Sequence, residues 1–249
     1  MANAEYSMRY IAPGGQVYNL LRGGRSGAFI DMGTLTGFVG EFEDAPVKTV
    51  GVAGVMVDFR DRVVNQMTGS FTLVVFSREE WVQARRDFST RQYGTLILEG
   101  ESRYVLRVRS SVSLPAPGSV PRSGTRIELS LVSDDGVWVS EVSEPDSVVT
   151  VTNWGDVPVW PRIVWDGAGG SVILPSGAEL HLPAVDKQHT LHLERRESGR
   201  VYTRDGVAKE VTRKVDAVGE CVPVGESRTF TIPEGARLDW EIGVFDPWI

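Results

Sequence analysis

The sequence has 249 residues, of which 41% are hydrophobic and 24% charged, a composition typical of globular proteins. Its net charge of −7 at pH 7 argues against nucleic acid as a partner, because phosphate binding needs a positive surface. No run approaches the ~20 apolar residues that cross a bilayer, and the N-terminal stretch lacks a signal-peptide pattern. We therefore expect no membrane partner and synthesis in the cytoplasm.

Cys221 is the only cysteine, which excludes a disulfide within the chain and a cysteine-rich zinc site. Strand-forming residues are abundant, and 27 glycines and 13 prolines punctuate the chain throughout. Long runs of helix-forming residues are nearly absent. The predicted fold class is all-β with one helix.

The one helix is predicted directly after a buried strand. Residues 69–76 form a short β-branched and aromatic run of strand length. Ser77 and Glu80 then have the spacing of a capping box, in which each side chain satisfies free backbone amides at a helix start. Apolar residues follow at helical spacing, namely Trp81, Ala84 and Phe88. The helix is expected over residues 78–90.

A hairpin and a loop follow in the chain. Residues 95–98 and 104–108 flank a glycine-containing turn, and residues 127–131 alternate between apolar and polar side chains. Between them, residues 114–124 carry three prolines and two glycines, which prevent a regular ladder. We predict that this loop is an assembly arm ordered by a partner, with the candidate residues Leu114, Pro115, Pro117, Gly118 and Pro121.

The composition changes near residue 145. Residues 133–147 contain five acidic and no basic side chains, which suggests a connector between an N-terminal domain, 1–145, and a C-terminal domain, 146–249. Beyond it, closely spaced turn signals separate short strand-like runs, which favours a β-sandwich or jelly roll. These runs are residues 148–152, 162–165, 171–174, 190–193, 229–232 and 238–244.

Residues that could carry chemistry give little support to an enzyme. The common nucleotide-binding, hydrolase, zinc-protease and calcium-binding motifs are absent, and a Ser-His-Asp triad has no positive support. His189 and His192 lie three apart in an expected strand and therefore point to opposite faces; the third histidine is His181. The acid pairs Asp58 with Asp61 and Asp239 with Glu241 are expected to partner nearby arginines. We expect no catalytic residue, metal ligand or cofactor.

Tryptophan is concentrated toward the C-terminal end, where five of the seven lie: Trp154, Trp160, Trp165, Trp240 and Trp248. Exposed tryptophans on a β-sandwich could stack on sugar rings. The alternative is that they pack in the core, cover its ends or meet another subunit. The candidate aromatic contact surface consists of Trp154, Trp160 and Trp248.

Residues 151–165, VTNWGDVPVWPRIVW, carry a family resemblance. They resemble the segment that opens the C-terminal galectin-like sandwich of siphophage distal tail proteins (Dit). The helix, the hairpin and later segments such as residues 201–206, 230–235 and 245–249 follow in the order of that family. Where many relatives carry Asp-Pro before an aromatic residue, this chain has DDGVW at 134–138.

The resemblance implies a phage structural protein with two domains. An N-terminal sandwich or barrel-like domain with a helix would form a hexameric ring, and galectin-like C-terminal sandwiches would project from it. The ring would join the tail tube to the tail tip in the virion, with tail tube, tape measure and tip or fibre proteins as partners. No catalysis is implied. The alternatives are a carbohydrate-binding β-sandwich module and a hydrolase acting on cell-wall polymers.

Overall fold

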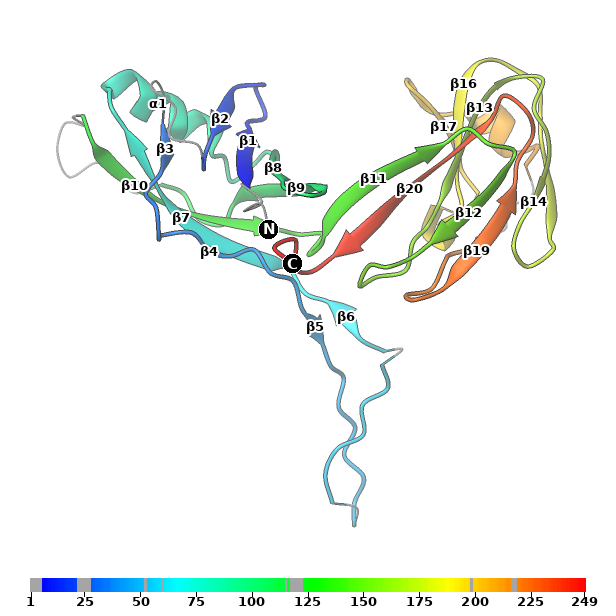
Figure 1. Cartoon of the computed structure of the whole chain (residues 1–249), viewed down its shortest axis with the longest axis horizontal. Helices are drawn as coiled ribbons and strands as arrows, with labels where there is room; N and C mark the ends of the chain where they lie inside the picture. Colours follow the sequence, from blue (N-terminus) through cyan, green and yellow to red (C-terminus); the bar gives the residue numbers. More distant parts are fainter. Residues whose placement is uncertain are drawn as a thin grey trace. The chain divides into compact units, whose positions relative to one another are not determined.

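The computed structural model describes residues 6–21, 28–51, 53–59, 61–114, 116, 123–197, 199–215 and 219–249. The chain forms two compact units (Figure 1). The first unit comprises Met1–Trp138 together with Val244–Ile249, and the second comprises Val139–Gly243. A boundary near residue 145 stays a prediction.

The first unit is built on an antiparallel sheet that does not close into a barrel. Its strand order runs β2, β1, β8, β9, β10, β7, and both β3 and β4 pair with β7 at the far edge. The strands predicted at residues 69–76, 95–98, 104–108 and 127–131 are all present and slightly longer than expected. The bounds are β1 Ser7–Ile11, β2 Val17–Asn19, β3 Phe29–Ile30, β4 Thr36–Gly37, β7 Met67–Val75, β8 Gly94–Glu99, β9 Arg103–Ser110 and β10 Thr125–Ser133.

The core of the first unit lies between the two halves of this curled sheet. Strands β7 and β10 pair along nine residues, and alternate side chains on each are buried. The Phe88 ring joins the two halves, because it stacks on Tyr10 of β1 at 4.4 Å and meets Phe71 of β7 at 6.2 Å. An aromatic cluster therefore closes the core beneath the helix.

Helix α1 spans Arg78–Asp87 and begins where the capping box predicts. Ser77 Oγ accepts a bond from the Glu80 amide at 3.1 Å, and the Glu80 carboxylate reaches back to the Phe76 amide at 2.7 Å. The helix ends three residues before the expected position. Its last residue, Asp87, is buried and accepts a bond from Tyr18 Oη at 2.5 Å.

The second unit is a sandwich of two antiparallel sheets. One has the order β18, β17, β16, β13, β20, β11, and the other β12, β19, β14, β15. Each predicted run of this region falls on a strand. The bounds are β11 Trp138–Glu144, β12 Val148–Thr152, β13 Arg162–Gly167, β14 Gly170–Ile173, β15 Glu179–Leu182, β16 Val185–His192, β17 Val201–Thr203, β18 Gly206–Val207, β19 Ser227–Thr231 and β20 Arg237–Val244.

The division between the units falls within the acidic stretch that was expected to connect the domains. This stretch also contains strand β11, which pairs with β20 and was not predicted. Two of its polar side chains share one face and find partners there: Ser143 donates to Asp239 at 2.5 Å, and Glu141 lies 3.9 Å from Arg162. Two short helices also accompany the predicted one, η1 (Arg195–Glu197) and α2 (Lys209–Thr212).

Candidate functional site: an apolar hairpin arm

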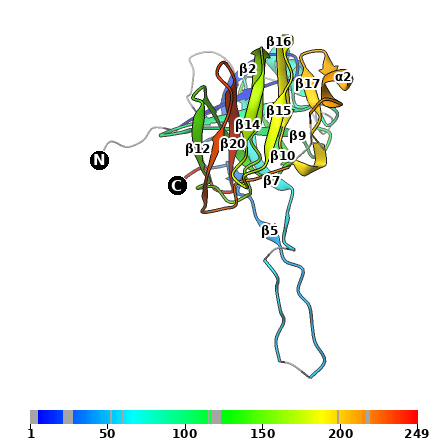
Figure 2. The same ribbon diagram turned by 90° about the vertical axis from the view of Figure 1, so that its right-hand side faces the viewer.

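The most distinctive surface of the first unit is a long hairpin that leaves the sheet between β4 and β7 (Figures 1 and 2). We call residues 41–65 the arm. Its base is the short ladder of β5 (Phe42–Glu43) with β6 (Val63–Val64). Farther out, Val47 and Met56 exchange backbone bonds of 2.8 and 3.0 Å. The turn beyond them contains Gly51 and Gly54, both with φ above +80°.

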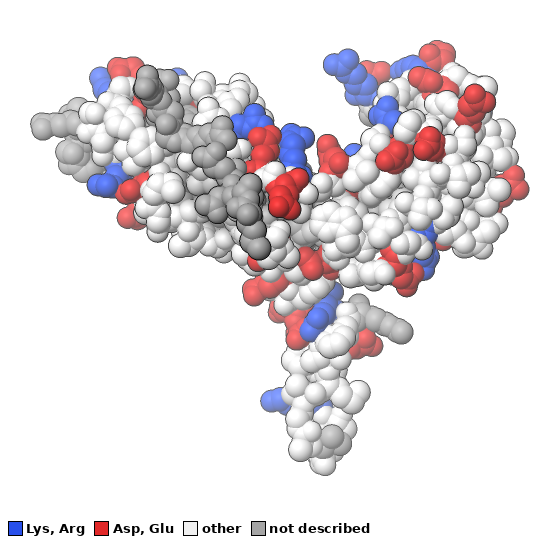
Figure 3. Space-filling view, viewed as in Figure 1, with Lys and Arg blue, Asp and Glu red and all other residues white. Residues whose placement is uncertain are grey.

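The outer part of the arm, residues 45–57, is the tip. Lys48 is its single charged residue, and Figure 3 shows few charged side chains on the visible face of this region. Four of its apolar side chains are exposed. The exposed fraction is 62% at Val47, 103% at Val50, 52% at Val55 and 71% at Met56. A contiguous exposed apolar surface of this kind is typical of an interaction site.

An irregular segment separates the base from the tip. Glu43 pairs with Val63, and farther out Val47 pairs with Met56. Three residues separate these pairs on the first side of the hairpin, and six separate them on the second side. The larger side contains Phe59, whose ring lies 4.0 Å beneath the Arg62 guanidinium although the side chain is 71% exposed. The arm therefore bends at a bulge that presents an aromatic side chain.

Arg62 links this bulge to the base of the arm. Its Nε donates to Asp44 on the opposite strand at 2.6 Å, and its guanidinium also lies 5.7 Å from the Phe42 ring centroid. One side chain thus contacts both strands and the bulge. We infer that Arg62 holds the inner half of the arm in one shape.

The root of the arm packs closely against the first unit. Gly40 donates its N–H to the Phe245 carbonyl at 2.9 Å, and the Phe42 ring meets the Phe245 ring edge-on at 4.8 Å. A Cβ on Gly40 would lie 2.4 Å from the Phe245 ring, and one on Gly136 would lie 2.0 Å from the Asn65 carbonyl oxygen. Only glycine fits at either position.

Solved structures of phage tail proteins are similar to this chain over nearly its full length. Phage SPP1 Dit, described as a hub adsorption apparatus, is similar with a TM-score of 0.59 and 12% identity over 96% of this chain and 99% of that one. The phage P2 baseplate in its activated conformation with Ca is similar with a TM-score of 0.54 and 9% identity, covering 96% and 98%. The fold is that of Dit. No protein-family model and no curated protein matches the sequence.

The assembly arm predicted from the sequence, residues 114–124, is a different segment from the hairpin arm at residues 41–65. Pro115, Pro117, Gly118 and Pro121 lie outside the described residues, so that arm stays a prediction. Leu114 is described, and its carbonyl accepts a bond from Arg85 at 3.0 Å.

The arm at residues 41–65 was missed because its signal is ambiguous. An apolar run on each side of Gly51 and Gly54 predicts a hairpin, but hydrophobicity alone suggests that such strands are buried. The absence of alternating polar residues in the tip was the available clue.

The tryptophans of the predicted aromatic surface fall in different units. Trp154 and Trp160 belong to the second unit and Trp248 to the first. Trp154 is 56% exposed, whereas the other two are half-buried. Trp248 packs edge-on against Tyr6 at 5.7 Å between centroids. The aromatic contact surface stays a prediction, with Trp154 as its most accessible member.

Trp154 sits on a loop that is held in place from beneath. The buried Asn153 side chain donates to the carbonyls of Val157 and Val222, each at 2.9 Å, and accepts from the Gly155 amide at 3.0 Å. A Cβ on Gly155 would lie 2.3 Å from the Gly243 carbonyl oxygen. The Asn and Gly of the VTNWGD segment therefore fix this loop.

Two of the histidines and the acid pair Asp239 with Glu241 are engaged in packing and ion pairs. His189 is buried beside Trp165, and His192 meets Tyr202 edge-on, where burial lowers the pKa of His192. Arg162 donates to Glu241 at 2.7 Å. The described residues contain no group of three or more potential ligands placed to hold a metal. No helix among them is long and apolar enough to cross a membrane.

Proposed function

We propose that this protein is a distal tail hub of a long-tailed phage, a hexameric ring that joins the tail tube to the tail tip. The observation that carries the proposal is the fold, which matches a phage hub protein and a phage baseplate over nearly the full length of each chain. The exposed apolar arm adds a feature of this chain itself that suits assembly.

The arm gives the proposed ring a physical basis. Fully burying a Val or Met side chain is favourable by about 1.5 to 3 kcal/mol, so several such residues on one tip provide a substantial driving force. A surface that binds a different surface on the next copy produces a heterologous contact, which closes into a ring when the rotation between copies allows it. The same chemistry needs no catalytic residue, metal or cofactor.

The proposed partners follow from the place of a hub. One face of the ring would meet the tail tube and tape measure proteins, and the other would meet tip or fibre proteins. The protein would be made in the host cytoplasm and incorporated in the virion. It would act as an adaptor that binds the tail tube on one face and the tip proteins on the other.

The test is the mass of the purified protein. Native mass spectrometry and negative-stain microscopy are expected to show a closed ring of six copies. A variant whose tip is replaced by Asn-Gly between Asp44 and Asp58 is expected to remain folded by circular dichroism and to lose the ring. A wild-type chain that stays monomeric at high concentration and does not bind isolated tail tubes would contradict the proposal.

A second candidate function is carbohydrate binding by the second unit. The exposed Trp154 on its fixed loop favours it, because a rigid exposed tryptophan can stack on a sugar ring without loss of conformational freedom. Glycan-array screening followed by calorimetry tests it. Binding that disappears in Trp154→Ala and persists in Trp160→Ala would support this function, and the absence of any binding glycan would remove it.

A further inference from the structure

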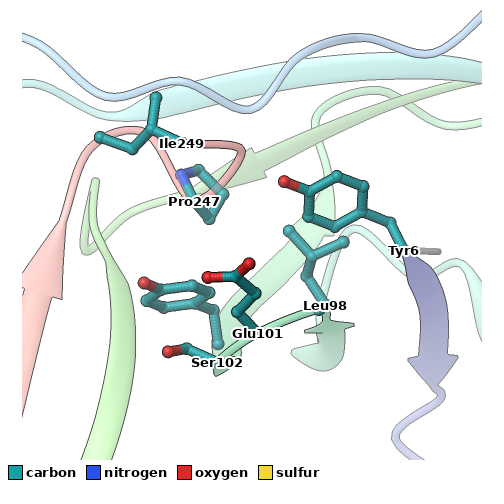
Figure 4. Close-up of a pocket in the computed structure, with 8 residues that line it drawn as sticks. Tyr6, Leu98, Glu101, Ser102, Pro247 and Ile249 are labelled. Carbon is teal, nitrogen blue, oxygen red and sulfur yellow. The ribbon is translucent and has the colours of Figure 1, made fainter. Parts of the chain in front are cut away.

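A pocket in the first unit lies where the segment after β20 returns to the hairpin of β8 and β9 (Figure 4). Its floor contains Leu98, Tyr104 and Pro247, which are almost fully buried, and its accessible apolar lining includes Ile249. Tyr6 borders the opening, and Figure 4 shows the Glu101 carboxylate pointing toward Pro247. The pocket therefore combines an apolar lining with one acidic side chain.

The walls of this pocket are held by specific contacts. Tyr6 Oη donates to the Trp248 carbonyl at 2.9 Å, which ties the start of β1 to the returning segment. The Tyr6 ring lies against Gly100, where a Cβ would be 2.8 Å from the ring. Tyr104 is 9% exposed and thus fixed in the core. A preformed pocket loses little entropy when a partner enters.

Among the described residues, one side-chain carboxylate at the pocket makes no ion pair. Glu99 pairs with Arg9 at 2.5 Å and lies 3.9 Å from Arg103. Glu101 is exposed and makes no ion pair among the described residues. On the arm, Lys48 is also exposed and makes no ion pair within the described part of the chain. It is the only lysine before residue 187.

The tip does not lie in this pocket of its own chain, since none of its described residues is among those that line it. The described hydrogen bonds of residues 45–57 join Val47 to Met56, and none of them joins the tip to the sheet. Figures 1 and 2 both show the arm leading away from the sheet that carries the pocket. An extended strand rises about 3.3 Å per residue, so the distance from Phe42 to Gly51 allows a reach of roughly 30 Å.

We propose that the tip of one copy docks in this pocket on a neighbouring copy, with Lys48 paired to Glu101 and the tip's apolar side chains against the accessible lining residues Tyr6 and Ile249. The inference rests on the proposed self-assembly and names the receiving surface. Charge complementarity identifies the occupant, because the pocket offers one unpaired acidic side chain and the tip one unpaired basic side chain. Each copy then gives one arm and receives one.

Cysteine cross-linking tests this contact directly. In a Cys221→Ser background, a chain carrying both Val50→Cys and Ser102→Cys is expected to give a ladder of covalent oligomers under mild oxidation. Val50→Cys alone mixed with Ser102→Cys alone is expected to give covalent dimers and no ladder. Ser130→Cys, an exposed serine of the same unit, is the matched control for Ser102→Cys and is expected to give no cross-link.

A charge swap supplies a second, independent measurement. Lys48→Glu or Glu101→Lys alone is expected to weaken self-association by about tenfold, because like charges then meet in the contact. The combined swap is expected to restore association to within about twofold of wild type. Glu128→Lys, at another exposed acid without a described ion pair, is the matched control and is expected to leave association unchanged.

The outcomes separate this inference from the proposed function. A closed ring without the ladder, or a swap that fails to rescue, overturns the pocket as receptor and leaves the ring intact. Covalent dimers from Val50→Cys alone would indicate that two arms meet each other, which also overturns it. A chain that stays monomeric and uncross-linked overturns both proposals.

Discussion

The indole N–H of Trp138 donates a hydrogen bond of 2.9 Å to the backbone carbonyl of Phe38, and both residues are buried. Phe38 has φ of +59°, and it is the only non-glycine residue with positive φ in the part of the chain that the structure describes. Its ring covers Gly69, where a Cβ would lie 2.3 Å away. The bond therefore stabilises an unfavourable backbone conformation at the point where β4 leads into the arm.

Trp138→Phe is expected to lower the free energy of unfolding by about 2 to 4 kcal/mol, because it leaves the Phe38 carbonyl without its donor and leaves space in the core. Urea unfolding followed by circular dichroism measures the change. Trp154→Phe, at an exposed tryptophan, is the control and is expected to change it by less than about 0.5 kcal/mol. Equal effects of the two substitutions would contradict the role given to this bond.

Gly40→Ala tests the packing of the arm root. The added methyl group would lie 2.4 Å from the Phe245 ring and 2.6 Å from the Gly136 carbonyl oxygen, so something must move. We expect a loss of about 1 to 3 kcal/mol in thermal or urea unfolding. Gly14→Ala is the matched control, because a Cβ there has nothing within 4 Å. If Gly40→Ala behaved like Gly14→Ala, the close packing would be disproved.

Alkaline pH is expected to destabilise the aromatic cluster beneath α1. Burial, followed by the hydrogen bond to Asp87, raises the pKa of Tyr18, so the folded chain disfavours the ionised phenol. The stability that this group provides is complete below the ordinary tyrosine pKa of about 10 and is lost as pH rises beyond it.

Tyr18→Phe removes this group from the titration. We expect the variant to be less stable at pH 7, because it lacks the bond to Asp87, and to lose less stability than wild type between about pH 9.5 and 11.5. Urea unfolding across this range gives both quantities. An unchanged slope in Tyr18→Phe would disprove the assignment.

Asn153→Ala tests the loop that presents Trp154. The substitution removes three hydrogen bonds from a side chain that is 1% exposed, which we expect to cost about 2 to 4 kcal/mol. The tryptophan emission of the folded variant is also expected to change, because the loop loses its support. Thr150→Ala, on the exposed face of β12, serves as the comparison. A loss as small as that of Thr150→Ala would rule out this role.

Local signals predicted half of the described strands and the start of the helix. The Ser77 and Glu80 pair determines where α1 begins, because both side chains satisfy amides within a single turn. The family resemblance also rested on residues with a physical role: Asn153 and Gly155 fix a loop that other side chains could not form. Such information lies within a few residues and can be read from the sequence.

The features that were missed depend on distant parts of the chain. Whether the valines of the tip are buried or exposed depends on what packs over them, which the residues themselves do not encode. Strand β11 was not predicted because the partners of Glu141 and Ser143, which are Arg162 and Asp239, lie far along the chain. The packing of Phe245 on Gly40 joins residues that are 205 positions apart, and no local sequence pattern predicts such a contact.

The division of the chain into units has a consequence for the order of events during synthesis. The second unit is inserted between Trp138 and Val244, so the ribosome completes it before Phe245 emerges. Until then Gly40 and Phe42 lack the neighbour that fixes the root of the arm. A nascent chain therefore carries the exposed hairpin before the contacts that fix its root can form.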